Sequence, residues 1–288
     1  MIEILATGPQ SLIQDLGRPG WSNIGVGPSG AFDRASLRLA NRLVGNSETA
    51  PGIETLGGGL RLRFNEPTIV SVTGADGPLH VITNDIPRPT GRNAPLTLAG
   101  GDVLSIEAPT RGLHSYVGIR RSINVAFTLE SASTDTLAAI GPTALVAGQR
   151  LTLANAAMTH PPIDLAIARS MTGPMHVIRG PRWDWFTDEA QAAVTRHTWT
   201  VSPISSRIGM RLVGAYLERR EPNRELASEP MVTGAIQVPP DGLPVILGPD
   251  RPTTGGYPVI AVVVDSHLDR LAQIAPGDPV AFRVIPLE

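Results

Sequence analysis

The apolar segments of this sequence are short, and turn-forming residues separate them. The longest apolar run extends only from Val259 to Val264, between Pro258 and Asp265. The 288 residues include 30 Gly and 27 Pro, which interrupt helix interiors but suit the turns between strands. A chain divided in this way does not favour a bundle of long helices, so we predict an ordered, mostly β protein.

Many segments have the length and composition of strands. In the first half of the chain the predicted strands are Ile2–Leu5, Leu60–Phe64, Thr68–Thr73, Leu79–Thr83, Val103–Ile106 and Ser115–Ile119. In the second half they are Met175–Arg179, Thr198–Ile204, Arg211–Val213, Ala235–Val238, Pro244–Leu247, Val259–Val264 and Val280–Val284. Short strands at this spacing are typical of antiparallel sheets and barrels.

Two segments have helical periodicity instead. Residues Ala31 to Val44 place apolar side chains at helical spacing, with Asp33 in the first turn and Gly45 where the helix would end. A second helix is predicted near Asp188–Thr195, with Thr187 as its N-cap. The periodicity lapses at residues 155–162, so we place a linker there and expect domains at 1–160 and 161–288.

Two residue types are missing, and their absence excludes several kinds of chemistry. All 24 basic residues are arginine, and the chain has no cysteine. Without lysine there is no Walker-type phosphate loop and no Schiff base. Without cysteine there is no thiol nucleophile, disulfide or thiolate zinc site. The six histidines share no metal-ligand spacing, so we predict no metal site.

Net charge and hydropathy limit the binding partners and the cellular location that we expect for the protein. A net charge of −2 indicates no general attraction to nucleic acid or to anionic lipid. No apolar run approaches the length of a membrane span. The segment from Met1 to Leu5 is too short and too acidic for a secretory signal, so we expect a soluble, cytoplasmic protein.

Two local motifs have simpler explanations than cofactor binding. Residues 25–30 match G-x-G-x-x-G, but they lack the preceding buried strand and the βαβ alternation of a dinucleotide site. Their glycines, followed by a helix, remain a candidate cradle for an anion. The cluster of Trp183, Trp185 and Phe186 favours packing in a core or an interface over stacking on a ligand.

Two longer stretches are denser in polar groups than a β scaffold requires. The first runs from Gln14 to Glu54, and the second runs from Ser206 to Pro258. Carboxylates, guanidinium groups and glycine-rich turns can together bind an oxyanion and transfer a proton. Buried Asp–Arg pairs that hold loops together explain the same residues equally well.

Both stretches contain long motifs in a fixed order. The first half contains Q-D-L-G-R-x-G, G-V-x-x-S-G-A-x-D and A-N-x-L-V-G-N. The second half contains S-R-x-G-x-R-L-x-G, G-A-I-Q-V-P-P-D-G and D-R-x-T-T-G-G-Y-P. These motifs resemble those of the allophanate hydrolase subunit 2 family. The resemblance extends over nearly the whole chain and implies two tandem cyclophilin-like β-barrel domains with a few short helices.

The resemblance also implies an activity and a partner. The family includes KipA, the C subunit of the bacterial ATP-dependent 5-oxoprolinase and the matching half of the carboxyltransferase part of urea carboxylase. We therefore expect an enzyme subunit that hydrolyses a C–N amide bond, opening 5-oxoproline to glutamate with ATP and a KipI-like (allophanate hydrolase subunit 1) partner. ATP would bind to this chain, to the partner or to both. Two alternatives stay open: a regulatory module that antagonises a KipI-like kinase inhibitor, and a carboxyltransferase half of a biotin-dependent system.

The same resemblance directs attention to particular residues, and the missing lysine requires that the cations be arginine. We assign oxyanion binding to Arg18, Arg207, Arg211 and Arg251. We assign proton transfer or structural pairing to Asp15, Glu54, Glu229 and Asp250. The candidate substrate-binding residues are Gln14, Asn41, Asn46, Gln237, Thr253, Thr254 and Tyr257.

The middle of the chain departs from the family pattern. Residues 121–123 read R-S-I where many members have G-G-I, and residues 130–134 read E-S-A-S-T where G-S-R-S-T is usual. His114 stands at a position where arginine is usual, and Gln149 stands where an aspartate is expected. If this segment shapes the substrate pocket or the partner contact, we expect an altered specificity or a loss of activity.

Overall fold

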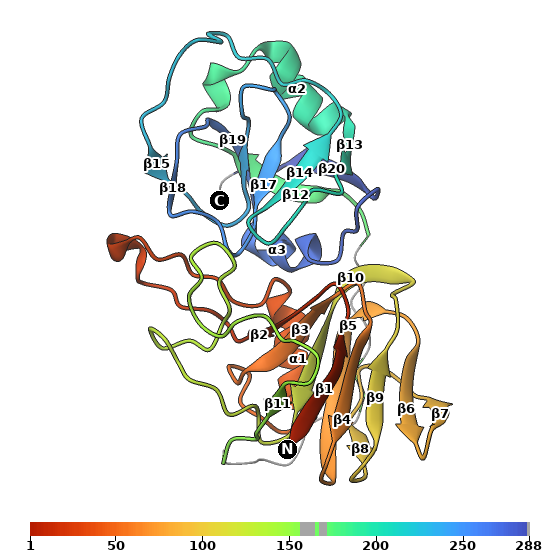
Figure 1. Ribbon diagram of the computed structural model, residues 1–288. Helices are drawn as coiled ribbons and strands as arrows, with labels where there is room; N and C mark the ends of the chain where they lie inside the picture. The colour runs from red at the N-terminus through yellow and green to blue at the C-terminus, as the bar shows by residue number, and fades with distance from the viewer. Residues whose placement is uncertain (156–164, 167–171, 287–288) are drawn as a thin grey trace. The chain divides into compact units, whose positions relative to one another are not determined.

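The computed structural model describes residues 1–155, 165–166 and 172–286. The chain divides into two compact units (Figure 1). The first unit comprises residues 1–18, 29–135 and 139–169, and the second comprises residues 19–28, 136–138 and 170–288. The predicted boundary and nearly all of the predicted linker fall on residues 156–164, which lie outside the described residues.

The first unit is built from two antiparallel sheets around one core. One sheet has the order β11-β1-β4-β9-β6-β7, and the other has the order β2-β3-β10-β5-β8. The strands of the first sheet are β1 (Ile2–Thr7), β4 (Leu60–Phe64), β6 (Leu79–Thr83), β7 (Ile86–Pro89), β9 (Val103–Ile106) and β11 (Arg150–Leu151). Those of the second are β2 (Gln10–Gln14), β3 (Gly52–Leu56), β5 (Thr68–Asp76), β8 (Leu96–Leu98) and β10 (Arg111–Ile119).

Strand β4 shows how the sequence pattern builds this core. Leu60, Leu62 and Phe64 are buried, whereas Arg61 and Arg63 between them are exposed. Successive side chains of a strand point to opposite faces, so this alternation places one face in the core. Both sheets contribute to the same apolar cluster.

One α-helix, α1 (Arg34–Leu43), belongs to the first unit. Asp33 is its N-cap, because its carboxylate accepts a hydrogen bond from the Ser36 amide at 2.9 Å. Leu37 packs with Tyr116 in a small apolar cluster. The predicted helix is confirmed, although it begins after Asp33 because that residue caps it.

The second unit is a closed barrel of seven strands in the order β12-β19-β16-β17-β14-β13-β20. These strands are β12 (Met175–Arg179), β13 (Thr198–Val201), β14 (Gly209–Val213), β16 (Ala235–Gln237), β17 (Val245–Leu247), β19 (Val259–Val263) and β20 (Pro279–Val284). The pair β12 and β20 is parallel, and the other pairs are antiparallel. The prediction of a mostly β protein is therefore confirmed.

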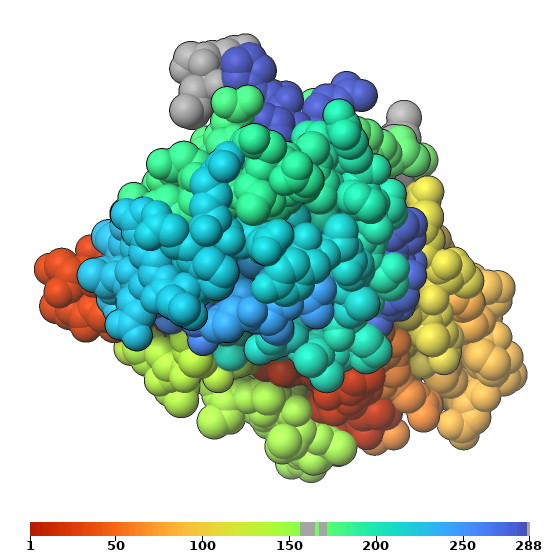
Figure 2. All heavy atoms as spheres, turned by 90° about the horizontal axis from the view of Figure 1, so that it is seen from above, coloured from red at the N-terminus to blue at the C-terminus, as the bar shows by residue number. Residues whose placement is uncertain are grey.

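Further elements complete the second unit. They are η1 (Ser22–Ile24), η2 (Trp183–Trp185), α2 (Asp188–Arg196), α3 (Asp265–Leu271) and the two-stranded pair of β15 (Glu229–Pro230) and β18 (Thr254–Gly255). The hydroxyl of Thr187 accepts the Ala190 amide at 3.2 Å, which confirms the predicted cap of α2. Figure 2 shows one face of this unit, on which the cyan residues between β14 and β15 form a broad part of the surface. Among the described residues, no helix combines the length and hydropathy needed to cross a membrane.

Candidate functional site

Asp15 directly follows β2 and is buried in the first unit. Its Oδ1 accepts hydrogen bonds from the Ser131 hydroxyl at 2.6 Å, the Ser133 hydroxyl at 2.5 Å and the Gly17 amide at 2.8 Å. Its Oδ2 accepts the Ala132 amide at 2.7 Å. A carboxylate has about four acceptor sites, so these donors occupy Asp15 fully and tie two loops to it.

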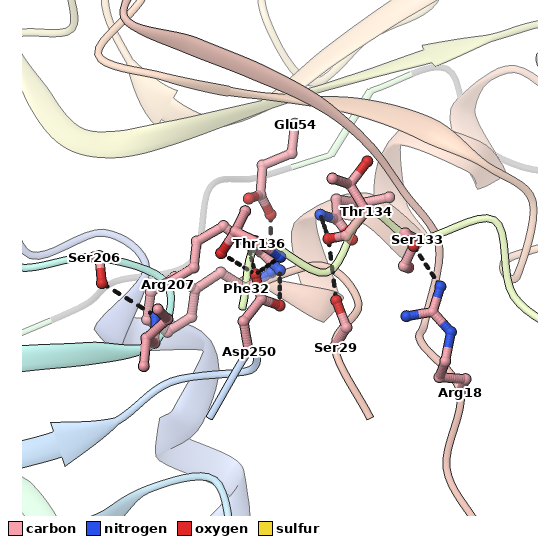
Figure 3. A network of polar contacts seen from close by, with 12 residues as sticks. Arg18, Ser29, Phe32, Glu54, Ser133, Thr134, Thr136, Ser206, Arg207 and Asp250 are labelled. Carbon is pink, nitrogen blue, oxygen red and sulfur yellow. Dashed lines mark hydrogen bonds and ion pairs between the residues drawn. The ribbon is translucent and has the colours of Figure 1, made fainter. Parts of the chain in front are cut away.

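The Arg18 guanidinium binds backbone carbonyl groups of the same loop. The side chain is almost fully buried, Nε donates to the Thr128 carbonyl at 3.3 Å, and Nη2 donates to the Ser133 carbonyl (Figure 3). Gly141 makes this approach possible, since a Cβ there would lie 2.1 Å from the Ser133 carbonyl oxygen. Asp15 and Arg18 therefore hold the segment in which the sequence departs from the family pattern.

Glu54 lies opposite Tyr116 on the neighbouring strands β3 and β10. Its Oε2 accepts the Tyr116 hydroxyl at 2.8 Å and the Phe32 amide at 2.9 Å, and the same hydroxyl accepts the Asp33 amide at 2.7 Å. Burial, together with the charges of Glu54 and Asp33, raises the pKa of Tyr116 well above its ordinary value. The hydroxyl therefore stays protonated and donates to Glu54.

Gln14 lies at the end of β2, next to the loop that Asp15 binds. Its Nε2 donates to the Thr134 carbonyl at 2.9 Å. The Ser29 hydroxyl donates to the same carbonyl at 3.1 Å, as Figure 3 shows. Gln14 Oε1 and Thr134 Oγ1 are buried without a hydrogen-bond partner within the described part of the chain. One hydrogen of the Gln14 amide nitrogen is thus engaged, and the amide oxygen has no donor in the described chain.

Asn41 and Asn46 join α1 to its neighbours. The Nδ2 of Asn41 donates to the Ala50 carbonyl at 2.7 Å, and that of Asn46 donates to the Ile119 carbonyl at 2.8 Å. The Oδ1 of Asn46 accepts the Arg121 amide at 3.0 Å. The amide groups of both side chains therefore have partners within the protein, and the substrate-binding role assigned to them stays a prediction.

In the second unit, Arg207 and Asp250 form a buried ion pair with two hydrogen bonds. Arg207 Nε donates to Asp250 Oδ2 at 2.9 Å, and Nη2 donates to Oδ1 at 3.0 Å (Figure 3). Thr136 donates to Oδ2 from its amide at 3.0 Å and from its hydroxyl at 2.7 Å. Burial would raise the pKa of Asp250, but the charge of Arg207 and these hydrogen bonds outweigh it and hold the pKa below its ordinary value.

The next residue, Arg251, has a different environment. Only 8% of it is exposed, and its Nη1 donates to the Pro252 carbonyl at 3.1 Å. Within the described ranges no carboxylate forms an ion pair with Arg251, and its Nε is buried without a hydrogen-bond partner. Desolvation by burial lowers the pKa of this guanidinium. The second unit thus contains a buried cation whose charge no acidic side chain of the described residues balances.

The loop that carries Arg251 also gathers other predicted residues. Gly255 on this loop pairs with Glu229 through β18 and β15, and the Tyr257 carbonyl accepts Gln237 Nε2 at 3.3 Å. A Cβ at position 255 would lie 2.6 Å from that Nε2, so a side chain there would displace the Gln237 amide. Residues 250–258, which we call the Arg251 loop, therefore carry a guanidinium, accept the side-chain amide of Gln237 and pair with Glu229 through the backbone.

The remaining predicted residues are placed less centrally. Glu229 forms an ion pair with Arg182. The sequence analysis did not identify Arg182 as a candidate, although it lies in the segment G-P-R-W-D-W-F at residues 180–186. Thr254 and Tyr257 are exposed on the Arg251 loop, and the Thr253 carbonyl accepts the Met231 amide at 2.9 Å. Arg211 is exposed on β14. Within the described residues, the side chains of Arg211, Thr254 and Tyr257 join no polar network, and their roles stay predictions.

Several residues in these networks escaped the sequence analysis. They are Tyr116, Ser131, Ser133, Thr136 and Arg182, all of which contact a predicted residue directly. Tyr116 offered a signal, because it is one of only three tyrosines and lies inside a predicted strand. Among the described residues, no three His, Asp or Glu side chains gather as metal ligands.

Comparison with known proteins places the whole chain in one group. A family model described as "Carboxyltransferase domain, subdomain A and B" matches residues 24–284. The chain is 33% identical to the 5-oxoprolinase C subunit of Haemophilus influenzae and also to that of Escherichia coli, with all of this chain and 92% of each relative covered. It is also 33% identical to urea amidolyase of Saccharomyces cerevisiae, where it covers 16% of the longer protein.

Solved structures give the same result. The crystal structure of Kluyveromyces lactis urea carboxylase matches with a TM-score of 0.89 and 29% identity, covering 99% of this chain and 27% of that one. The K. lactis urea amidolyase structure has the same TM-score and identity, with 19% of its chain covered. From its sequence motifs, its barrel and these matches, the chain belongs to the family of carboxyltransferase domains with subdomains A and B.

Proposed function

We propose that this chain is the C-type subunit of an ATP-dependent 5-oxoprolinase that acts with a KipI-like subunit. The buried Arg251 guanidinium carries the proposal, because no carboxylate of the described residues balances its charge and its loop also contacts Gln237 and Glu229. The full-length similarity to the C subunits of two 5-oxoprolinases supports the choice of substrate.

The chemistry of lactam opening requires what the Arg251 loop offers. ATP activates the unstrained amide by phosphorylating its oxygen, so negative charge must be bound and water must lose a proton. Arg251 would bind the substrate carboxylate or the developing oxyanion, and a desolvated guanidinium binds such a group more strongly than an exposed one. Gln237 would orient the amide, and Glu229 would accept the proton.

The phosphates of ATP need cations as well. Because the chain has no lysine, arginines, hydroxyl groups and backbone amides must bind the phosphates here unless the partner subunit does so. The Arg251 loop supplies one guanidinium together with Thr253 and Thr254. We therefore propose that the partner contributes part of the nucleotide site.

The test is turnover by the reconstituted pair. The chain would be co-purified with its KipI-like subunit, and the release of glutamate from 5-oxoproline would be measured with and without ATP. We expect Arg251→Gln to lower kcat/KM by about 100-fold, as removal of a single oxyanion-binding group typically does. Arg283→Gln, a change at an exposed arginine on β20, is the matched control and should retain full turnover.

Each outcome of this experiment has a clear meaning. An intact complex that releases no glutamate with ATP would contradict the oxoprolinase function and favour the regulatory alternative. Full turnover by Arg251→Gln would show that the Arg251 loop is not the site. Complex formation should survive the substitution, because Arg251 is buried within the second unit.

A second candidate is carboxyl transfer from carboxybiotin to urea. The TM-score of 0.89 to a urea carboxylase favours it, although this chain covers only 27% of that protein. Carboxyl transfer would require a biotin-carrying protein, so avidin would abolish it. Avidin-sensitive consumption of urea by the complex, without glutamate release from 5-oxoproline, would replace the first proposal with this one.

A further inference from the structure

The side-chain amide of Gln237, at the end of β16, is held by two acceptors. The residue is buried, with 6% of its surface exposed. Its Nε2 donates to the Tyr257 carbonyl at 3.3 Å and to the Met231 sulfur at 3.2 Å. An amide nitrogen carries two hydrogens, so these two acceptors engage both of them. Nε2 therefore has no hydrogen left to donate to a ligand.

The same acceptors decide which way round the amide lies. If the amide were turned over, Oε1 would lie against a carbonyl oxygen and a thioether sulfur, and neither of these groups can donate a hydrogen bond. The nitrogen therefore stays on the side of Met231 and Tyr257. Oε1 accepts no hydrogen bond from the described residues. An unpaired acceptor on a buried side chain indicates that a water or a ligand donates to it.

Met231 is itself fixed, so its sulfur keeps its position. Its residue is 5% exposed and belongs to an apolar cluster with Leu247. The Met231 amide donates to the Thr253 carbonyl at 2.9 Å, which attaches the residue to the Arg251 loop. Gly255 leaves room for the side chain, since a Cβ there would lie 3.3 Å from Met231 Cγ.

Gln237 lies directly beside the Arg251 loop. It pairs with Val259, the first residue after that loop, and its amide reaches back to the Tyr257 carbonyl within it. Because Ile236 pairs with Ala261, β19 contains one extra residue at this point. Bulges of this kind often lie next to functional sites, where they change the direction of a side chain. Gln237 is thus placed where a ligand of the Arg251 loop would meet it.

On the basis of the oxoprolinase function proposed above, we propose that Gln237 selects substrates that carry an N–H group, and that Met231 positions its amide to do so. Gln237 can only accept a hydrogen bond, and the lactam N–H of 5-oxoproline can only donate one. A lactone or a cyclic ketone of the same size would leave Oε1 unpaired, which is unfavourable in a buried site. The substrate class is therefore that of lactam carboxylates, whose carboxylate Arg251 would bind.

The experiment compares two ligands by calorimetry on the co-purified complex. One is 5-oxoproline, and the other is 3-oxocyclopentanecarboxylate, in which a methylene group replaces the N–H. We expect 5-oxoproline to bind at least about tenfold more tightly, as gain of one buried hydrogen bond allows. Gln237→Leu, which has no acceptor, should abolish this preference.

Met231→Leu conserves the volume of the side chain but removes the sulfur, so it should reduce the preference several-fold. Met210→Leu is the matched control, because Met210 is another buried methionine of the barrel, on β14, and does not contact Gln237. It should keep the full preference for the lactam.

A second measurement follows the Gln237 amide itself and does not depend on the reaction. In the isotope-labelled chain, the NMR signals of this NH₂ group are assigned by their absence in Gln237→Leu. Both hydrogens have acceptors, so we expect them to exchange slowly with water. Met231→Leu should shift one of the two signals and speed its exchange, whereas Met210→Leu should change neither.

The outcomes separate the selectivity from the proposed reaction. Glutamate release together with equal affinity for the lactam and the ketone would overturn the selectivity and leave the oxoprolinase function standing. Selective binding of the lactam without glutamate release would contradict only the reaction. Binding of neither compound by an intact complex would overturn the selectivity, and unchanged NMR signals in Met231→Leu would overturn the positioning role of Met231.

Discussion

The Asp15 network and the Arg207–Asp250 network are each built around a buried aspartate, but different groups bind the two carboxylates. In the first unit, Asp15 accepts four hydrogen bonds from hydroxyls and amides of the chain itself. In the second unit, Asp250 is bound by a guanidinium and by Thr136, and Arg251 beside it has no carboxylate partner in the described chain. A polar motif is therefore a stronger candidate for ligand binding where the protein leaves a charge unbalanced.

This difference predicts different costs for removing each carboxylate. Loss of one partner from a buried ion pair leaves the other charge buried without a counter-charge. Loss of an acceptor from neutral donors instead allows the loop to rearrange so that water binds those donors. Four tryptophans allow the comparison to be measured, because Trp21, Trp183, Trp185 and Trp199 all belong to the second unit. Their fluorescence reports on that unit, and far-UV circular dichroism reports on both.

The largest effect is expected for Asp250→Ala. The substitution leaves Arg207 buried without its ion pair to Asp250, so the second unit should lose about 3–5 kcal/mol of unfolding free energy. Urea denaturation followed by tryptophan fluorescence measures it. Asp188→Ala removes an exposed ion pair to Arg220 and should cost less than about 1 kcal/mol. Equal effects of the two changes would contradict a buried ion pair.

A smaller effect is expected for Asp15→Ala. Four donors lose their acceptor, and we expect a cost of roughly 3 kcal/mol to the first unit, with increased protease sensitivity of residues 128–134. Circular dichroism during urea denaturation and limited proteolysis test this. Asp76→Ala, which removes a partly exposed pair with Arg111, is the control. A stable Asp15→Ala chain with lost turnover would instead assign Asp15 to the chemistry.

Acid should weaken the second unit more gently than Asp250→Ala does, because protonation keeps the side chain in place. The folded-state pKa of Asp250 is depressed, so its contribution is fully present above the unfolded-state pKa of about 3.9. That contribution is lost as the pH falls through the lower folded-state pKa. Stability measured from pH 7 to pH 2 should show this loss, and Asp250→Asn should lack this component.

The smallest effect on stability is expected for Arg251→Met. Burying a guanidinium without an ion pair is unfavourable, so replacing it with an apolar chain of similar length should change the unfolding free energy by less than about 1 kcal/mol or increase it. Thermal and urea denaturation measure this change. A large loss of stability would show that Arg251 is structural, and the contrast between the two networks would then disappear.

The predictions of elements succeeded where an apolar pattern carried the information. Strands such as β4, β6, β9 and β12 lie where the sequence predicts them, and α1 and α2 follow their caps. Strands β2 and β3 were not predicted, because they contain polar residues such as Gln14 and Glu54 that are nonetheless buried. Such residues are buried because partners distant in the sequence satisfy their hydrogen bonds.

The sequence determined the class of fold, the family motifs and the restriction of every side-chain cation to arginine or histidine. It could not distinguish Arg18, whose guanidinium binds carbonyl groups of a loop, from Arg251, which is buried without a carboxylate partner in the described chain. This distinction depends on which groups meet across the fold, because burial and pairing set the free energy of a charge and only the tertiary structure decides both.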